Sequence, residues 1–189
     1  MYVTIANYIT AARLGFMPVF LACVLGYSPE RAYLRQAAFF LYAAFALSDI
    51  LDGQIARRFH LESRLGKRLD PLADKLLINL GFIFVAANGW FNPGMPLWAP
   101  PVFLARDVYI VLGAYLINER YGPFKVKPRL SGKTTTVLQM AVMISVLLSN
   151  PLTPFLLAAS LAATGWSSID YFYAGYAQVK ERTKADAAR

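Results

Sequence analysis

Six apolar stretches, most of them roughly 20 residues long and almost free of charge, run through this sequence of 189 residues. A helix needs about 20 consecutive apolar residues to cross the hydrocarbon core of a bilayer. The chain is also 57% hydrophobic and only 16% charged, which is unusual for a soluble domain. We therefore expect an all-α integral membrane protein with six transmembrane helices, forming a single domain over residues 1–189. The predicted spans are Tyr8–Tyr27, Leu34–Ala56, Leu69–Gly89, Leu97–Ile117, Thr134–Leu148 and Leu152–Ala177.

Lysine and arginine gather in alternate loops of this arrangement. Most of them lie between the second and third spans, between the fourth and fifth spans, and in the tail after the sixth span. Short loops rich in these residues stay on the cytoplasmic side, so both termini are predicted to be cytoplasmic. This topology and attraction to anionic lipid head groups account for the net charge of +8. We therefore expect membrane lipids as partners and no nucleic acid.

Aspartates lie where a bilayer disfavours them. Six of the seven are in or at the ends of the apolar spans, although a charge at the centre of a bilayer costs about 3 kcal/mol unless it is paired or hydrated. Asp49 and Asp52 are three positions apart, and Asp70 and Asp74 are four apart, so each pair shares one face of a helix. The loop between the two spans is short, which predicts antiparallel neighbouring helices. The four carboxylates should then converge in a polar cavity open to the cytoplasm.

Four carboxylates that lie close together repel one another unless they bind protons or cations. The chain has one cysteine and one histidine, so an all-oxygen site for two Mg²⁺ or Mn²⁺ ions is predicted. Such a pair of ions suits phosphoryl chemistry. The alternative is structural, with the acids paired to Arg57, Lys75 and Arg106 to hold the helices together.

Residues beside the aspartates suit an anionic ligand. Gly53 and Ala56 carry little side-chain bulk where a nucleotide would approach the helix, and Arg57 follows to pair with phosphate. Gly66 allows close helix approach, and Ser63 offers a hydroxyl donor. These residues are candidates for contact with a phosphate-bearing ligand.

The whole pattern from Asp49 to Asp74 reads D-x2-D-G-x2-A-R-x8-G-x3-D-x3-D. It resembles, without departure, the signature of the class I CDP-alcohol phosphatidyltransferase family. The resemblance implies six transmembrane helices, a homodimer, and transfer of the phosphatidyl group from CDP-diacylglycerol to an alcohol with release of CMP. It also implies that Asp49, Asp52 and Asp70 hold two divalent cations, and that Asp74 both binds metal and acts as the general base.

The same resemblance implies that Gly53, Arg57 and Ser63 contact the cytidine diphosphate group. A second element, Asn7-x-Ile9-Thr10-x-x-Arg13, is similar to the amino-terminal N-x-I/L-T-x-x-R element of the family, with Ala6 where a proline is usual. We expect two sets of substrate contacts, the first from these likenesses and the residues around the aspartates, the second mainly from cations outside the signature. The CDP-lipid set is Asn7, Thr10, Gly53, Ala56, Arg57, Ser63 and Gly66, and the acceptor set is Arg13, Arg106, Lys127, Arg129 and Lys133.

The signature does not identify the acceptor alcohol, so its prediction depends on residues outside the signature. Arg106 lies inside a span and Lys127, Arg129 and Lys133 follow in a loop, where cations would bind an acceptor phosphate or merely face lipid head groups. Phosphatidylglycerophosphate synthases resemble this chain, but they typically have Arg-Glu and a second arginine eight residues later, where this chain has Asp107 and Ala114. The chain is more similar to the eukaryotic-type cardiolipin synthases, which implies phosphatidylglycerol as the acceptor. Glycerol 3-phosphate is the alternative.

Two other classes place aspartates in apolar helices. An intramembrane prenyltransferase would lack the Gly-x2-Ala-Arg insert, and a non-enzymatic ion transporter would produce no CMP. Asp170, near the end of the last span, is expected to be satisfied by water or arginine and is left out of the site. Without a long Arg/Ser-rich presequence, we expect a bacterial inner membrane, with the active site facing the cytoplasm.

Overall fold

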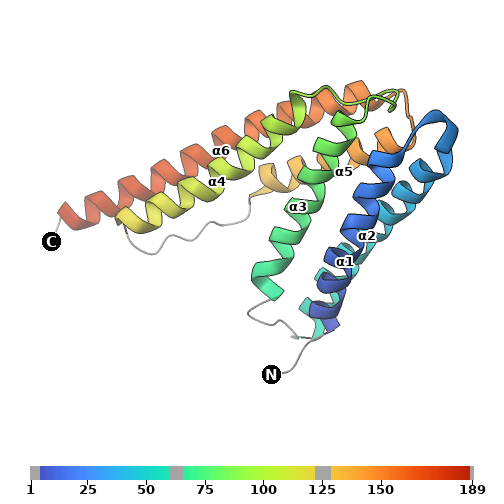
Figure 1. The fold of residues 1–189 in the computed structure, drawn as a ribbon. Helices are drawn as coiled ribbons and strands as arrows, with labels where there is room; N and C mark the ends of the chain where they lie inside the picture. Colours follow the sequence, from blue (N-terminus) through green and yellow to red (C-terminus); the bar gives the residue numbers. More distant parts are fainter. Residues whose placement is uncertain (1–4, 60–65, 122–128, 188–189) are drawn as a thin grey trace. The chain divides into compact units, whose positions relative to one another are not determined.

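The computed structural model describes the backbone of residues 5–59, 66–121 and 129–187. Within these ranges, the side chains of residues 5–14, 49–59, 66–74, 77, 121, 181 and 184–187 lie outside the described part. The described residues form helices joined by turns, and they contain no strand. In chain order (Figure 1) the helices are α1 (Ile5–Gly26), the short 3₁₀-helix η1 (Pro29–Arg31), α2 (Ala32–Phe59), α3 (Gly66–Ala87), α4 (Ala99–Tyr121), α5 (Leu130–Leu147) and α6 (Thr153–Ala187).

The all-α prediction is confirmed for the described residues, and each predicted span coincides with one of the six α-helices. The largest difference is at the end of α6, which continues past Ala177 to Ala187. The added residues are rich in alanine, lysine, glutamate and arginine, which form helices well but are too polar to count as a span. Hydropathy therefore marks the apolar part of a helix and misses its polar extension.

The chain divides into two compact units. The first consists of Met1–Leu97 with Met140–Pro154, and the second consists of Trp98–Gln139 with Phe155–Arg189. The expectation of one domain over residues 1–189 stays a prediction.

In the first unit, α2 and α3 both pack on α1. The ring of Phe20 is fully buried, with Tyr42 and Phe45 of α2 at centroid distances of 5.7 and 6.3 Å. Phe20 also lies against Gly81 of α3, where an added Cβ would be 3.2 Å from the ring. The glycine thus lets α3 approach α1 closely.

A second contact along each pair gives the direction of the helices. A Cβ at Gly26, the last residue of α1, would lie 3.1 Å from Leu34 near the start of α2, whereas Phe20 meets the later Tyr42, so α1 and α2 are antiparallel (Figure 1). In contrast, α3 follows α1 in the same direction, because Gly81 lies against Phe20 and Asn88 binds Val24 (Figure 1). The side-chain amide of Asn88, just after α3, donates to the carbonyls of Val24 and Tyr27 at 2.7 and 3.0 Å. It satisfies carbonyls that the end of α1 leaves without helical partners. It also fixes the end of α3 to the end of α1.

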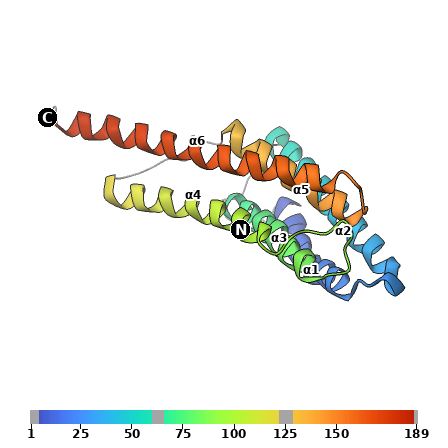
Figure 2. The ribbon, with the colours of Figure 1, turned by 90° about the horizontal axis from the view of Figure 1, so that it is seen from above.

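In the second unit, α4 and the first part of α5 pack on α6. Thr135 Oγ1 donates to the carbonyl of Ala163 at 3.0 Å, and Ser131 bonds Asp170, so α5 and α6 are antiparallel. The pairs Arg106–Ser167 and Ile117–Gly175 show that α4 and α6 are parallel, and they run side by side in Figure 1 and Figure 2.

Within the described residues, two helices are long and apolar enough to cross a bilayer, over Ala99–Arg120 and Leu130–Leu147. Two shorter helical stretches are also apolar, Gly15–Gly26 and Ile78–Ala87. Large apolar side chains such as Phe40, Val111 and Phe155 are about 70% exposed, as expected for surfaces that face lipid. These features are consistent with a membrane protein.

Candidate active site

The four motif aspartates lie on two different helices. Asp49 and Asp52 are in the last part of α2, and Asp70 and Asp74 are in the first part of α3. The backbone is helical across both pairs, so spacings of three and four residues keep each pair on one helix face. Their side chains lie outside the described part of the structure.

Helix direction brings the two aspartate-bearing segments to one end of the first unit. Because α2 runs against α1 and α3 runs with it, the end of α2 and the start of α3 both lie where α1 begins (Figure 1). Two pairs of carboxylates carried by such helix ends are a donor set that fits hard divalent cations. Among the side chains that the structure describes, which do not include these four aspartates, no group of three or more histidine, cysteine, aspartate or glutamate residues could hold a metal ion.

The residues expected at the CDP-lipid occupy the same three helices. Asn7 and Thr10 are in the first turns of α1, and Gly66 is the first residue of α3. The remaining helical members of this set are in the last turns of α2: Gly53, Ala56 and Arg57. The side chains of all these residues lie outside the described part of the structure, as does Ser63 entirely.

The predicted acceptor residues are spread more widely. Arg13 is in α1, but its side chain lies outside the described part, and Lys127 falls outside the described residues altogether. Arg106, Arg129 and Lys133 all belong to the second unit. Lys133 is exposed near the start of α5.

Arg106 is buried inside the second unit, with 7% of its surface exposed. Its two Nη groups donate to Asp107 Oδ1 at 2.8 Å and to Ser167 Oγ at 2.5 Å. The guanidinium also lies over the ring of Tyr171, 5.7 Å from the centroid. Its buried Nε–H has no acceptor among the described residues. Arg106 is therefore held in place while its buried Nε–H donor is still unused.

Close packing around Arg106 depends on a glycine. A Cβ at Gly132, in the first turn of α5, would lie 2.9 Å from Tyr171 Oη and 3.2 Å from Arg106 Nη2. Any larger residue here would displace the tyrosine or the guanidinium. Gly132 thus allows α5 to approach these two side chains.

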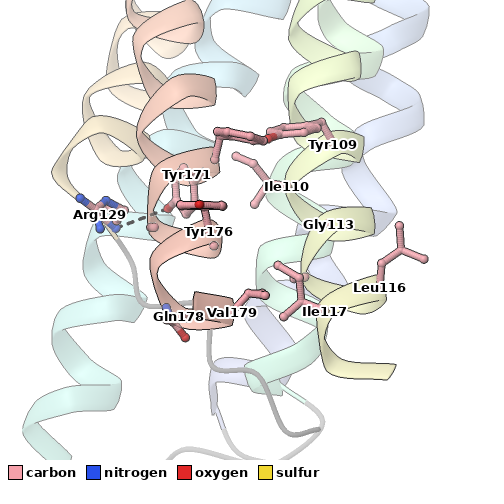
Figure 3. Close-up of a pocket in the computed structure, with 14 residues that line it drawn as sticks. Tyr109, Ile110, Gly113, Leu116, Ile117, Arg129, Tyr171, Tyr176, Gln178 and Val179 are labelled. Carbon is pink, nitrogen blue, oxygen red and sulfur yellow. Dashed lines mark hydrogen bonds between the residues drawn. The ribbon is translucent and has the colours of Figure 1, made fainter. Parts of the chain in front are cut away.

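Arg129 and Asp170 form an ion pair beside this cluster. Arg129 Nε donates to Asp170 Oδ2 at 2.6 Å, and Ser131 Oγ donates to the same oxygen. The backbone N–H of Arg129 also donates to Tyr171 Oη at 3.4 Å (Figure 3). The hydrogen bond to Asp170 raises the pKa of the Arg129 guanidinium, so this group keeps its charge. The expectation that arginine satisfies Asp170 is confirmed.

Tyr171 contacts both arginines and Ser167 accepts from Arg106, and neither residue was predicted from the sequence. A signal was available, because polar residues recur every three or four positions in this otherwise apolar helix. Buried Ser160, Thr164 and Ser167 follow this spacing, and Tyr171 continues it. Such a stripe indicates a polar face directed at neighbouring helices.

The chain matches one family model over most of its length. The model describes CDP-alcohol phosphatidyltransferases, and the match covers residues 3–166. This range includes the aspartate motif, Arg106 and Arg129, and it ends just before Ser167 and Tyr171.

Relatives with assigned names point in the same direction. A cardiolipin synthase (CMP-forming) of Streptomyces coelicolor is 34% identical over 98% of this chain and 86% of its own length. A CDP-diacylglycerol–glycerol-3-phosphate 3-phosphatidyltransferase of Aquifex aeolicus is 30% identical over 93% of this chain and 97% of its own. The human cardiolipin synthase (CMP-forming) is 28% identical over 90% of this chain but 54% of its own length. These matches confirm the resemblance, and the chain belongs to the CDP-alcohol phosphatidyltransferase family, whose members act in phospholipid biosynthesis.

Proposed function

We propose that this chain is a cardiolipin synthase that transfers the phosphatidyl group of CDP-diacylglycerol to phosphatidylglycerol and releases CMP. The complete aspartate motif from Asp49 to Asp74 supports this type of reaction. The acceptor is supported by the similarity, over nearly the whole chain, to a relative that bears this name.

In this proposal the four aspartates form the catalytic centre. Asp49, Asp52, Asp70 and Asp74 would hold two divalent cations, Mg²⁺ or Mn²⁺, which neutralise charge on the phosphates and acidify the acceptor hydroxyl when bound. Asp74 takes the proton from that hydroxyl as the general base. The hydroxyl oxygen then bonds to the phosphorus that carries the diacylglycerol, and the bond from this phosphorus to CMP breaks.

The remaining predicted residues bind the two substrates. The CDP group lies against the glycine and alanine surface of α2 and pairs with Arg57, while Asn7, Thr10, Ser63 and Gly66 complete that side. Arg106 and Arg129 bind the acceptor phosphate, aided by Arg13, Lys127 and Lys133. The unused Nε–H of Arg106 supports this role, because a buried donor without a partner is unfavourable until an acceptor binds.

Glycerol 3-phosphate is the competing acceptor. The Aquifex relative named for that substrate is 30% identical over nearly its full length. Against it, Asp107 and Ala114 stand where enzymes of that type typically have glutamate and a second arginine. Without that arginine, the site offers one cation fewer to glycerol 3-phosphate, which is small and doubly charged. This difference favours a lipid acceptor with one phosphate.

We further propose that the six helices cross the membrane with both termini in the cytoplasm, that the polar cavity opens to the same side, and that the enzyme is a homodimer in a bacterial inner membrane. The alternation of basic loops supports the orientation.

An acceptor panel tests the proposal. Purified protein is given CDP-diacylglycerol, Mg²⁺ or Mn²⁺, and either phosphatidylglycerol or glycerol 3-phosphate, and CMP release is measured. Phosphatidylglycerol should react faster, and a chelator should abolish the reaction until metal is restored. Faster CMP release with glycerol 3-phosphate would overturn the acceptor assignment, and no CMP with any acceptor would favour the ion transporter.

A further inference from the structure

A groove between α4 and α6 runs along the second unit, beyond the Arg106 cluster. Its volume is about 460 Å³, within the roughly 300–1,000 Å³ of sites that bind small molecules. Figure 3 shows Tyr109 and Ile110 of α4 facing Tyr176 and Val179 of α6 across it, with Arg129 at the side. The walls are mainly apolar, and Arg129 is the cationic residue among them.

The groove has free space beside Gly113 of α4. A Cβ added there would meet no heavy atom of the described residues within 4 Å, although Gly113 lines the groove. At Gly175 on the facing helix, the Cβ would instead lie 3.2 Å from Ile117 Cδ1. The two helices thus touch at Gly175 and leave space at Gly113.

Arg129 lines the edge of this groove. Asp170 accepts from its Nε, while no described residue accepts from its two Nη groups, and the side chain is 44% exposed. A guanidinium fixed through Nε offers its paired Nη donors to a phosphate. An anionic group at Arg129 with an apolar chain in the adjoining groove matches both surfaces.

We propose that this groove binds an acyl chain of the acceptor phospholipid, with the lipid phosphate at Arg129. The occupant is an anionic diacyl lipid, so the acceptor site selects for chain as well as head group. This inference rests on the proposed function, in which the acceptor is phosphatidylglycerol. Glycerol 3-phosphate has no chain to fill the groove.

Photolabelling tests the groove without turnover. Full-length protein in nanodiscs, without CDP-diacylglycerol or metal, is labelled with phosphatidylglycerol that carries a diazirine on one acyl chain, and adducts are mapped by mass spectrometry. Adducts should fall on residues 109–117 and 171–179. Unlabelled phosphatidylglycerol should compete at least about threefold better than phosphatidylcholine with the same chains, because an exposed ion pair contributes modestly.

Two glycines provide the matched variants. Gly113→Leu fills the groove, whereas Gly165→Leu makes the same change on α6 at another position with no described heavy atom within 4 Å of the added Cβ. Gly113→Leu should reduce groove labelling about tenfold, since leucine displaces roughly two methylene groups of the lipid. Gly165→Leu should leave labelling unchanged. Gly113→Ala should give an intermediate loss if the leucine variant does not fold.

Kinetics then links the groove to the acceptor. Gly113→Leu should raise the KM for dioleoyl-phosphatidylglycerol about tenfold, leaving the KM for CDP-diacylglycerol and for dihexanoyl-phosphatidylglycerol unchanged. A change in the CDP-diacylglycerol KM instead would assign the groove to the donor and overturn the inference. Unchanged labelling in Gly113→Leu, equal competition by phosphatidylcholine, or loss of a dimer in this variant would also overturn it.

The two proposals fail in different ways. If the wild type is labelled as expected but forms no CMP with phosphatidylglycerol, the groove stands as a lipid site and the proposed acceptor is wrong. If the enzyme forms cardiolipin but labelling lies elsewhere, the proposed function stands and the groove assignment is wrong.

Discussion

Arg129 and Asp170 lie 41 positions apart in sequence, yet Nε of the arginine is 2.6 Å from Oδ2 of the aspartate. The aspartate therefore fixes one edge of the guanidinium and leaves the other edge available. A basic residue that sequence alone assigns to a loop is oriented by an acid of α6.

This geometry predicts that lysine cannot replace Arg129. The single ammonium group of lysine can pair with either Asp170 or the acceptor phosphate, whereas the guanidinium of arginine can donate hydrogen bonds to both. Arg129→Lys should therefore raise the acceptor KM nearly as much as Arg129→Gln, by about three- to tenfold, with little change in kcat.

Because the pKa of Arg129 is raised, the wild-type guanidinium should stay charged and contribute no loss of acceptor affinity between pH 7 and 10.

The control is Arg31→Gln, which removes one exposed cation of η1 in the other unit and should leave the acceptor KM unchanged. If Arg129→Lys behaves like the wild type, charge alone matters and the orienting role of Asp170 is wrong.

Arg106 should combine a structural role with acceptor binding. Arg106→Met removes the countercharge of Asp107, and the loss of one partner from a buried pair destabilises a protein by about 3 kcal/mol. Adding Asp107→Asn should recover at least half of this loss in thermal unfolding, because it removes the negative charge that Arg106 neutralised. CMP release should stay low in both variants if Arg106 binds the acceptor. Recovery of activity together with stability would leave Arg106 with a structural role only.

Two glycines in the second unit should respond oppositely to the same change. Gly132→Ala places a methyl group 2.9 Å from Tyr171 Oη, so the tyrosine or α5 must shift at a cost of about 1–3 kcal/mol. Gly165→Ala meets no described heavy atom within 4 Å and should stabilise α6 by about 0.5–1 kcal/mol. Thermal unfolding of the two variants in detergent measures both effects. An equal response would mean that the close approach at Gly132 is not required.

Gln139 should tolerate replacement by a residue without polar atoms. The residue is 1% exposed, and neither the oxygen nor the nitrogen of its side-chain amide has a partner among the described residues. Leaving such a group unsatisfied costs about 1–3 kcal/mol, so Gln139→Leu should unfold at the same or a higher temperature. Thr135→Val offers the contrast, because Thr135 Oγ1 donates to Ala163 O and its loss should destabilise by about 1 kcal/mol. A marked destabilisation by Gln139→Leu would show that the amide is engaged by another group.

Asp74 should be essential for the reaction and dispensable for folding. Asp74→Asn keeps the size of the side chain but removes a base and an anionic ligand, so CMP release should fall at least about 100-fold. Asp186→Asn makes the same change in the tail and should have no effect. Size-exclusion profiles of both variants should match the wild type. Residual activity near the wild-type level would exclude Asp74 as the base.

The sequence by itself determined the all-α class, the helix positions and the family. These properties are local: apolar runs mark spans, and within the motif from Asp49 to Asp74 the helical repeat decides which residues share a face. Because this information lies in short segments, it can be read before any helix is packed.

Only the tertiary structure decided what surrounds the acceptor residues. Ser167 and Asp170 are 61 and 41 positions from the arginines that they bind, and the space at Gly113 depends on how closely α4 and α6 approach. Such contacts follow from side-chain packing between helices that are distant in the chain. The hydropathy of the sequence does not indicate which helix faces will pack together.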